Sequence, residues 1–306
     1  MVKKISRVLV TGGAGFIGSH LVEALFHAGY EIVVVDNLSH GDKKRIPPGV
    51  RLIITDIADP QLREIFQHVK PEVVFHLAAQ QDVGTAQKNP LFDARVNILG
   101  TINVLESCRL SGVKKIIYAD SVAGFGNPQK IPLVTNHPRQ PISFYGISKH
   151  TVEHYLEAYS RYFHLTYVGL ILANVYGPHQ DPLGEGGVVA IFAHRMNKNK
   201  TIVIYGDGKQ TRDFIYVTDV VNAFVEAIAY AENQFLMVGT ELETSINQLY
   251  NYMKKITQYQ KKPIYSMSRS GDVIQSVFNT SETKKILRWK PQYTIKKGLA
   301  LTVTSF

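Results

Sequence analysis

The residues with the clearest chemical potential are a tyrosine and a lysine four positions apart, Tyr145 and Lys149, in the segment YGISK. Side chains at positions i and i+4 of a helix lie on one face. A lysine ammonium close to a phenol favours the phenolate, so we expect Lys149 to lower the pKa of Tyr145 from its reference value of about 10. Such a phenol can take a proton from a sugar hydroxyl while a hydride leaves the same carbon.

A glycine-rich turn, GGAGFIG at residues 12–18, lies upstream of this pair. It follows an apolar run and precedes a helical pattern, which is the context of a dinucleotide-binding turn. Gly12 permits the turn, Gly15 lets the backbone approach a pyrophosphate, and Gly18 allows close packing of helix and strand. The N-terminus of the following helix then faces the phosphates. Asp36 ends the next apolar run, where a carboxylate binds the adenine ribose 2′-hydroxyl and favours NAD over NADP.

The elements that must position these residues alternate between apolar runs and helical patterns. Such alternation predicts an α/β fold, a doubly wound parallel Rossmann sheet with right-handed crossovers. We predict strands at residues 7–11, 31–36, 51–55, 73–77, 115–119 and 166–172. We predict helices at residues 16–28, 60–69, 92–110 and 148–162.

The regular alternation weakens after Asn174. Residues 177–187 predict a loop because they are rich in Gly, Pro and Asp. Beyond it the pattern predicts helices at 188–196 and 218–231 and a strand near 202–205. We therefore expect an NAD-binding Rossmann domain at 1–173 and a smaller mixed α/β C-terminal substrate-binding region at 174–306, with residues 213–231 packing back on the first domain.

The composition limits the class of protein. The chain has 306 residues, is 45% hydrophobic, carries a net charge of +9 and has one cysteine, Cys108. One cysteine excludes an intrachain disulfide framework and indicates a reducing compartment, so we expect a cytoplasmic protein. The chain shows no signal peptide and no membrane-length apolar run, so we expect no membrane partner. The lysines form scattered pairs without interleaved aromatic residues, so we expect no nucleic-acid partner; we also expect no metal.

The turn has the spacing Gly-x-x-Gly-x-x-Gly, and with Tyr145-x-x-x-Lys149 it resembles the extended short-chain dehydrogenase/reductase superfamily. It is most similar to the NAD-dependent epimerase/dehydratase family, and the resemblance runs over nearly the whole chain. It implies that Ser121, five residues before Gly126, joins Tyr145 and Lys149 as a catalytic residue. A serine hydroxyl can hydrogen-bond the reacting oxygen and fix its geometry.

The resemblance also implies two binding sites. The cofactor site for NAD comprises Gly12, Gly15, Phe16, Ile17, Gly18, Asp36, Asn37, Asp56, Ile57, Leu77, Ala78, Ala79, Asn97, Tyr145 and Lys149. The site for a UDP-sugar comprises Gln81, Ser121, Asn174, Val188, Tyr205, Arg212, Arg269, Asp272 and Ser276. Arginine suits the diphosphate because its planar guanidinium gives bidentate hydrogen bonds.

The activity that the resemblance implies is NAD-dependent 4-epimerisation of a nucleotide sugar, in particular the interconversion of UDP-glucose and UDP-galactose through a 4-keto intermediate. Helices 92–110 and 148–162 resemble those through which family members form homodimers, so we expect a homodimer. Several alternatives stay open: a 4-epimerase for UDP-glucuronate or UDP-N-acetylglucosamine, a sugar-nucleotide 4,6-dehydratase or reductase, and a non-catalytic dinucleotide-sensing protein. Val122 and Ala123 stand where dehydratases carry an acidic pair, which disfavours elimination of water.

Several positions differ from the family pattern. Asp120 stands where serine is common, Phe125 where tyrosine is common, and Ala86 where serine is frequent. Ile171 and His179 occupy positions where arginine is frequent. These differences concern the sugar pocket, and the sequence leaves the choice of sugar open.

Overall fold

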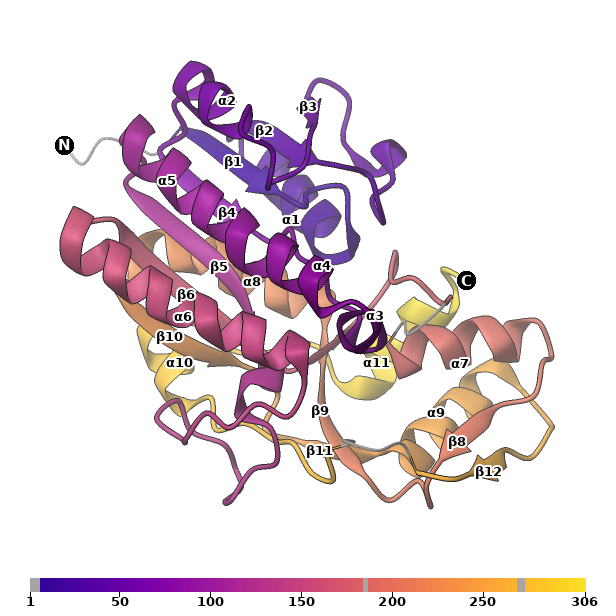
Figure 1. Cartoon of the computed structure of the whole chain (residues 1–306). Coiled ribbons are helices and arrows are strands. Elements are labelled where there is room, and N and C mark those ends of the chain that lie inside the picture. The colour runs from indigo at the N-terminus through magenta and orange to yellow at the C-terminus, as the bar shows by residue number, and fades with distance from the viewer. Residues whose placement is uncertain (1–5, 184–186, 269–272) are drawn as a thin grey trace.

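The computed structural model describes residues 6–183, 187–268 and 273–306. Figure 1 shows a large α/β part that holds the N-terminal half of the chain and a smaller region beside it. Arg269 and Asp272, both predicted to bind substrate, lie outside the described residues.

A parallel sheet of seven strands forms the centre of the described chain, in the order β10-β6-β5-β4-β1-β2-β3. Its strands are β1 (Arg7–Thr11), β2 (Glu31–Asp36), β3 (Arg51–Ile54), β4 (Val73–His76), β5 (Lys115–Ser121), β6 (Thr166–Leu172) and β10 (Gln234–Val238). Every neighbouring pair is parallel. The predicted α/β doubly wound sheet is confirmed. The strand order reverses beside β1, and ligands of such sheets bind at the carboxyl ends of the strands at this point.

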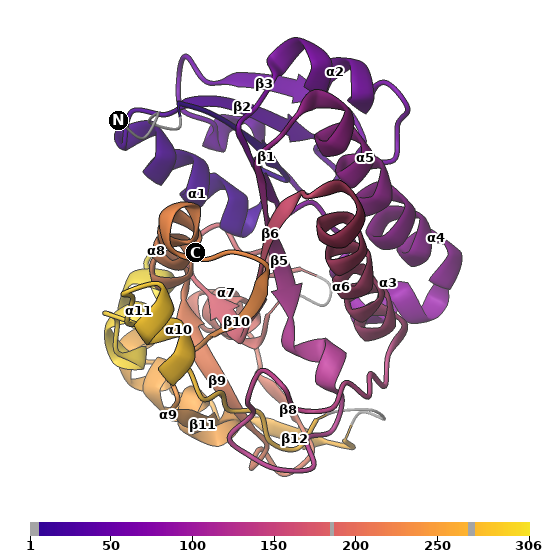
Figure 2. The same cartoon turned by 90° about the vertical axis from the view of Figure 1, so that its left-hand side faces the viewer.

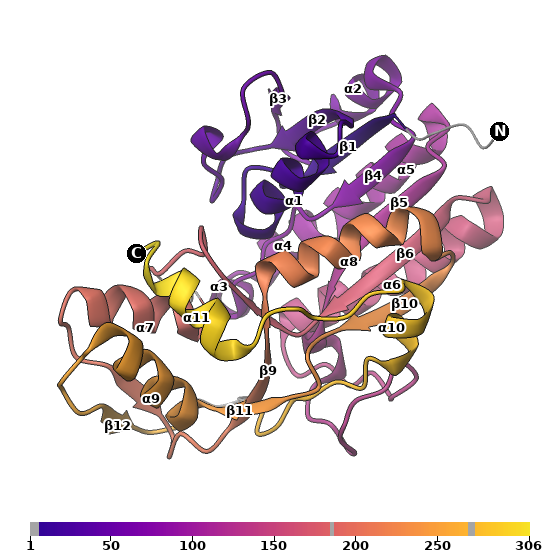
Figure 3. The same ribbon diagram turned by 180° about the vertical axis from the view of Figure 1, so that it is seen from behind.

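Helices cover both faces of this sheet. Figure 2 shows the sheet edge-on, with α1 (Phe16–His27) and α8 (Val217–Tyr230) on one side and α5 (Thr101–Ser111) and α6 (Phe144–Phe163) on the other. Helix α2 (Leu62–Val69) packs against α5. Figure 3 shows α8 lying next to α1 and across β5 and β6. A helix from the second half of the chain therefore covers the same face of the central sheet as α1.

The smaller region contains two short sheets. Strands β7 (Asn174–Tyr176), β9 (Thr211–Tyr216) and β11 (Glu243–Ser245) form one, and β8 (Val203–Tyr205) pairs with β12 (Ile264–Ser266) in the other. Helices α7 (Val188–Asn197), α9 (Ile246–Thr257) and α11 (Ile295–Val303) belong to this region, and α10 (Ser281–Ile286) packs against β10 of the central sheet. The remaining short helices are η1 (Lys43–Arg45), α3 (Val83–Lys88), α4 (Pro90–Ala94), η2 (Arg95–Gly100) and η3 (Val122–Phe125).

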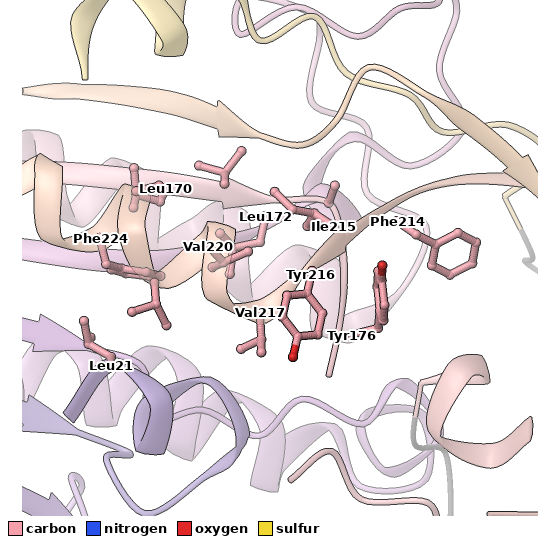
Figure 4. Close-up of a cluster of buried hydrophobic side chains, with 14 of the residues drawn as sticks. Leu21, Leu170, Leu172, Tyr176, Phe214, Ile215, Tyr216, Val217, Val220 and Phe224 are labelled. Atoms are coloured by element: carbon pink, nitrogen blue, oxygen red, sulfur yellow. The ribbon is translucent and has the colours of Figure 1, made fainter. Parts of the chain in front are cut away.

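One hydrophobic core joins the two parts. Figure 4 shows side chains of β6, β9 and α8 meeting Leu21 of α1 and Tyr176 of β7. The Tyr176 and Tyr216 rings lie 5.7 Å apart in an edge-to-face arrangement, which favours contact between aromatic rings. Strand β9 continues directly into α8, so the smaller region is anchored to the Rossmann sheet through buried side chains.

Three of the differences from the prediction affect the central sheet and the helices beside the site. Helix α6 begins at Phe144 because the Ser143 side chain accepts a hydrogen bond from the Gly146 amide and caps it, so Tyr145 lies inside the helix. The helix predicted at 92–110 is three consecutive segments, α4, the π-helix η2 and α5. Strand β10 was not predicted, and it pairs with β6, more than 60 residues earlier in the chain.

Candidate active site

The glycine turn packs tightly on its inner side and is open at Gly15. A Cβ at Gly12, where φ is +72°, would lie 2.7 Å from the Ala78 amide nitrogen, and a Cβ at Gly18 would lie 2.0 Å from the Gly12 carbonyl oxygen. At Gly15 only that same carbonyl oxygen comes close, at 3.2 Å. No acidic side chain stands in the first turn of α1 and no side chain caps it. The N-terminus of α1 therefore fits an anionic phosphate.

Asp36 ties this turn to the end of β2. One carboxylate oxygen accepts a hydrogen bond of 2.9 Å from the Ala14 amide, and the other accepts one of 2.8 Å from the Leu38 amide. Each oxygen keeps a further lone pair, so the carboxylate can also accept from a ligand hydroxyl. A Cβ at Gly41 would lie 2.8 Å from the Asp36 carboxylate, so a glycine is needed where the loop after β2 folds over it.

A cleft of about 250 Å³ runs along the carboxyl ends of the central strands. Every residue predicted to bind the cofactor lines this cleft except Asn97. The cleft thus fits NAD because it contains the open glycine turn at Gly15, a helix N-terminus without acidic side chains in its first turn, and the Asp36 carboxylate. The lining residues that sequence reasoning missed are Val35, Ser39, His40, Gly41, Thr55, Gln80, Phe92, Val96, Ala119, Asp120, Leu172, His179 and Asp181. A glycine shortly after the strand-ending Asp36 was the available signal for the 39–41 loop.

Asn97 lies behind the cleft wall, on the π-helix η2. Its amide exchanges two hydrogen bonds with the backbone of Gln80, at 2.8 and 2.9 Å. It also donates to the Ser148 hydroxyl at 3.0 Å and to the Asp93 carboxylate at 3.1 Å. Asn97 therefore holds the Gln80 loop against α6, and it contacts the cleft through Gln80.

Tyr145, Lys149 and Ser121 come from two elements that pack together, α6 and the end of β5. The Ser121 hydroxyl forms a hydrogen bond with the Tyr145 phenol. The same hydroxyl accepts from the Ala123 amide at 3.2 Å and caps the short helix η3. The cap fixes the orientation of Ser121 beside Tyr145, which suits a residue that must hold a reacting oxygen.

The pKa of Tyr145 differs in direction from the prediction. Part of the side chain reaches the cleft, but burial of the phenol raises its pKa to about 12, and the carboxylates of Asp120 and Asp93 add to this rise. The Ser121 hydrogen bond opposes the shift. The Lys149 ammonium donates to the Ala119 carbonyl oxygen at 2.6 Å and lies 4.0 Å from the centre of the Tyr118 ring. The expected lowering of the Tyr145 pKa is therefore wrong in its net direction, because burial is the largest influence on the phenol.

Five of the described residues predicted to bind substrate belong to the smaller region: Asn174, Val188, Tyr205, Arg212 and Ser276. The Asn174 Oδ1 atom at the start of β7 is buried and accepts no hydrogen bond from the described residues, which suits an atom that meets a ligand. On the neighbouring strand β9, Arg212 donates to the Thr211 carbonyl oxygen. Tyr205 ends β8 with 37% of its surface exposed. Val188 begins α7, and Ser276 is buried. Among the described residues that were predicted to bind only the substrate, Gln81 is the one that lines the cofactor cleft.

Comparison with known proteins gives consistent matches. The family described as the NAD dependent epimerase/dehydratase family matches residues 8–239. A UDP-glucose 4-epimerase of Mycolicibacterium smegmatis is 39% identical over 98% of both chains. The crystal structure of a Thermotoga maritima UDP-glucose 4-epimerase with UDP-glucose superposes with a TM-score of 0.95 at 42% identity, over 97% of both chains. That of a Thermus thermophilus UDP-glucose 4-epimerase with NAD gives a TM-score of 0.93 at 38% identity, over 98% of both chains.

In the described ranges, every helix is too short or too polar to cross a bilayer.

Proposed function

This chain belongs to the NAD-dependent epimerase/dehydratase family, and from this we propose that it is an NAD-dependent 4-epimerase that interconverts UDP-glucose and UDP-galactose. The observation that carries the proposal is that Tyr145 and Lys149 line the same cleft as the glycine turn and Asp36, and that the Ser121 hydroxyl is hydrogen-bonded to Tyr145. Near-full-length similarity to enzymes of this activity supports the choice of substrate.

We assign the cofactor residues from the cleft. The open side of Gly15 and the N-terminus of α1 would receive the pyrophosphate, and Asp36 would accept from the adenine ribose. Lys149 would hold the nicotinamide ribose. The chemistry that NAD supplies when bound is reversible hydride transfer at C4 of the sugar.

The protein's own residues move one proton and hold one oxygen. The Tyr145 oxygen takes the proton of the sugar 4-hydroxyl as C4 loses hydride, and it returns that proton when C4 regains hydride on its other face. Ser121 hydrogen-bonds the 4-oxygen and keeps it aligned. Because burial raises the pKa of Tyr145, a positive charge beside the phenol would be needed to favour the phenolate, and the Lys149 ammonium in the same cleft would supply it.

Product analysis tests this proposal. The protein is incubated with UDP-glucose and, separately, with UDP-glucuronate and UDP-N-acetylglucosamine, and the products are identified by NMR. We expect UDP-glucose to convert to UDP-galactose, approaching the same mixture from either side. Loss of water to a 4-keto-6-deoxy sugar would replace the proposal by a dehydratase. If the protein binds NAD but converts none of these sugars, the proposed activity would be replaced by that of a non-catalytic dinucleotide-sensing protein.

We also propose a homodimer and a cytoplasmic location. Apolar side chains stand exposed on the outer side of α4, η2 and α6, among them Leu91 at 83%, Leu99 at 60% and Tyr162 at 71%. A partner subunit would bury them. Light scattering tests the dimer, and Leu99→Glu with Tyr162→Glu should give a monomer. The single cysteine, Cys108, is buried, which suits a reducing compartment.

A further inference from the structure

A buried polar cluster contains the residue that precedes Ser121, and the proposed mechanism does not use it. Asp120 precedes Ser121 on β5 and is 3% exposed. Both of its carboxyl oxygens are buried and accept no hydrogen bond from the described residues. An unpaired buried carboxylate is costly, so such a group either takes up a proton or shares one.

A second carboxyl group, Glu153 of α6, belongs to the same cluster and is 6% exposed. Its Oε2 atom accepts from the Arg139 Nε at 3.0 Å and lies 3.3 Å from the His150 Nδ1. Its Oε1 atom is buried and has no hydrogen-bond partner in the described chain. A Cβ at Gly124 would lie 3.5 Å from Oε1, so this glycine leaves the oxygen open on that side.

The two carboxyl groups cannot both be ionised at low cost, because both are buried and their side chains lie within hydrogen-bonding reach of each other. Burial raises the pKa of Asp120, and the Glu153 charge raises it further. Burial also raises the pKa of Glu153, but the Arg139 charge and hydrogen bond oppose that rise. The cluster therefore favours an ionised Glu153 and a protonated Asp120. We call Asp120 and Glu153 the acid pair.

The acid pair is coupled to the catalytic lysine. Lys149 donates to the carbonyl oxygen of Ala119, the residue next to Asp120. Burial lowers the pKa of Lys149, and the Asp120 charge is the largest influence that opposes this. An ionised Asp120 thus helps to keep Lys149 charged, and a neutral Asp120 does not.

We propose that Asp120 is a positioning residue that acts through Lys149: with Glu153 it holds one proton at neutral pH, and the negative charge that it gains on losing this proton helps to keep Lys149 charged as the pH rises. The part of this proposal that concerns turnover rests on the proposed function. Opposite Asp120, β6 presents the buried apolar Ile171. The ionisable groups that act on or are acted on by Asp120 are Tyr118, Arg139, Tyr145, Lys149, His150 and Glu153.

Infrared spectroscopy of the protein without substrate tests the acid pair by itself. We expect the carbonyl stretch of a protonated carboxylic acid at neutral pH, its loss at alkaline pH, and its absence in Asp120→Asn. Glu153→Gln should move the loss of the band to lower pH, because the neighbouring negative charge is gone. Glu64→Gln changes an exposed carboxyl on α2, outside the cluster, and should leave the band unchanged. A wild-type protein without the band, or a band that survives in Asp120→Asn, would overturn the proposal.

The pH profile of turnover tests the link to Lys149. In Asp120→Asn we expect the alkaline limb of kcat for UDP-glucose to move down by about one to three pH units, so turnover on that limb falls about tenfold or more. A uniform loss at every pH, with the limb in place, is what a merely structural role gives and would overturn the link. If the wild-type protein converts no UDP-sugar, the proposed function fails, while the infrared band still decides whether the acid pair exists.

Discussion

The Lys149 ammonium donates a hydrogen bond of 2.6 Å to the carbonyl oxygen of Ala119. This contact joins helix α6, which carries Tyr145, to strand β5, which ends at Ser121. The three catalytic candidates are therefore held by two packed elements, with the loop geometry of η3 orienting the serine. Rigid support of this kind keeps reacting groups within the small tolerances that proton transfer requires.

Replacing Tyr145 by phenylalanine should remove turnover and preserve binding. The phenol is the group that exchanges a proton with the sugar, and loss of a general base or acid typically costs 10²–10⁴-fold. Tyr162→Phe, on an exposed side chain of the same helix, is the control and should keep wild-type turnover. Kinetic assays with NAD and UDP-glucose titrations make the comparison. Near-normal turnover in Tyr145→Phe would rule out this role.

Alanine at Gly18 should mainly lower the stability of the fold, whereas alanine at Gly15 should mainly weaken the binding of NAD. At Gly18 the new Cβ would lie 2.0 Å from the Gly12 carbonyl oxygen, so we expect a loss of about 1–3 kcal/mol in unfolding free energy. At Gly15 the contact is 3.2 Å, so stability should fall by less than about 1 kcal/mol. The methyl group there occupies the proposed phosphate position, and NAD should bind about tenfold more weakly or worse. Thermal unfolding and NAD titration separate the two effects. Unchanged NAD affinity in Gly15→Ala would contradict the proposed phosphate site at the glycine turn.

Asp36→Asn should weaken NAD and relax its selectivity over NADP. A carboxylate accepts strongly from a ribose hydroxyl and repels a 2′-phosphate, and a charge-assisted hydrogen bond contributes about 1.5–3 kcal/mol. Asp59→Asn is a matched control, because Asp59 also accepts from a backbone amide, that of Gln61 at 2.8 Å, but lies outside the cleft. Titrations with both cofactors decide the assignment. If the ratio of the NAD and NADP affinities is the same in Asp36→Asn as in the wild type, Asp36 does not determine the selectivity between the two cofactors.

His76 should make the protein less stable in acid. Thr101 donates to the Asn97 carbonyl oxygen, so the His76 Nε2 must donate to Thr101 and its Nδ1 must accept from Thr11. Burial lowers the pKa of this neutral imidazole to about 3 from 6.5.

Between those two pH values the unfolded chain binds a proton at His76 that the folded chain does not. The unfolding free energy should therefore fall as the pH drops from 6.5, with His76 contributing up to about 1.4 kcal/mol per pH unit. His76→Gln should reduce this slope, whereas a change at the exposed His27 should not. Denaturant unfolding at several pH values measures it, and equal slopes in wild type and His76→Gln would contradict the assignment.

The Rossmann half of the fold could be predicted because its strands are apolar runs bounded by turn residues. Strands β1, β2 and β6 have the predicted bounds. Strand β10 was missed because QFLMV is a short run that becomes a strand only by pairing with β6, and a pairing so distant in sequence leaves no local signal. The start of α6 depends on the Ser143 cap, and a serine just before a helical pattern is the local signal for such a start.

The parts of the site that belong to sequence motifs could be predicted. The glycine turn and Asp36 reach one cleft because the carboxyl ends of parallel strands meet at one edge. The direction of the Tyr145 pKa shift could not be predicted, because burial depends on the whole fold and no residue spacing reports it. The acid pair was hidden for the same reason: Asp120 and Glu153 are far apart in sequence and meet only through the packing of β5 and α6.

The most direct test of 4-epimerisation follows a deuterium label at C4 of UDP-glucose. If the protein removes and returns hydrogen at the same carbon within a closed cleft, NMR of the UDP-galactose formed in ordinary water should show deuterium retained at C4. The exchangeable proton handled by Tyr145 leaves the label on carbon untouched. Conversion in which the label is lost to solvent, or appears at C6 with loss of water, would contradict the account.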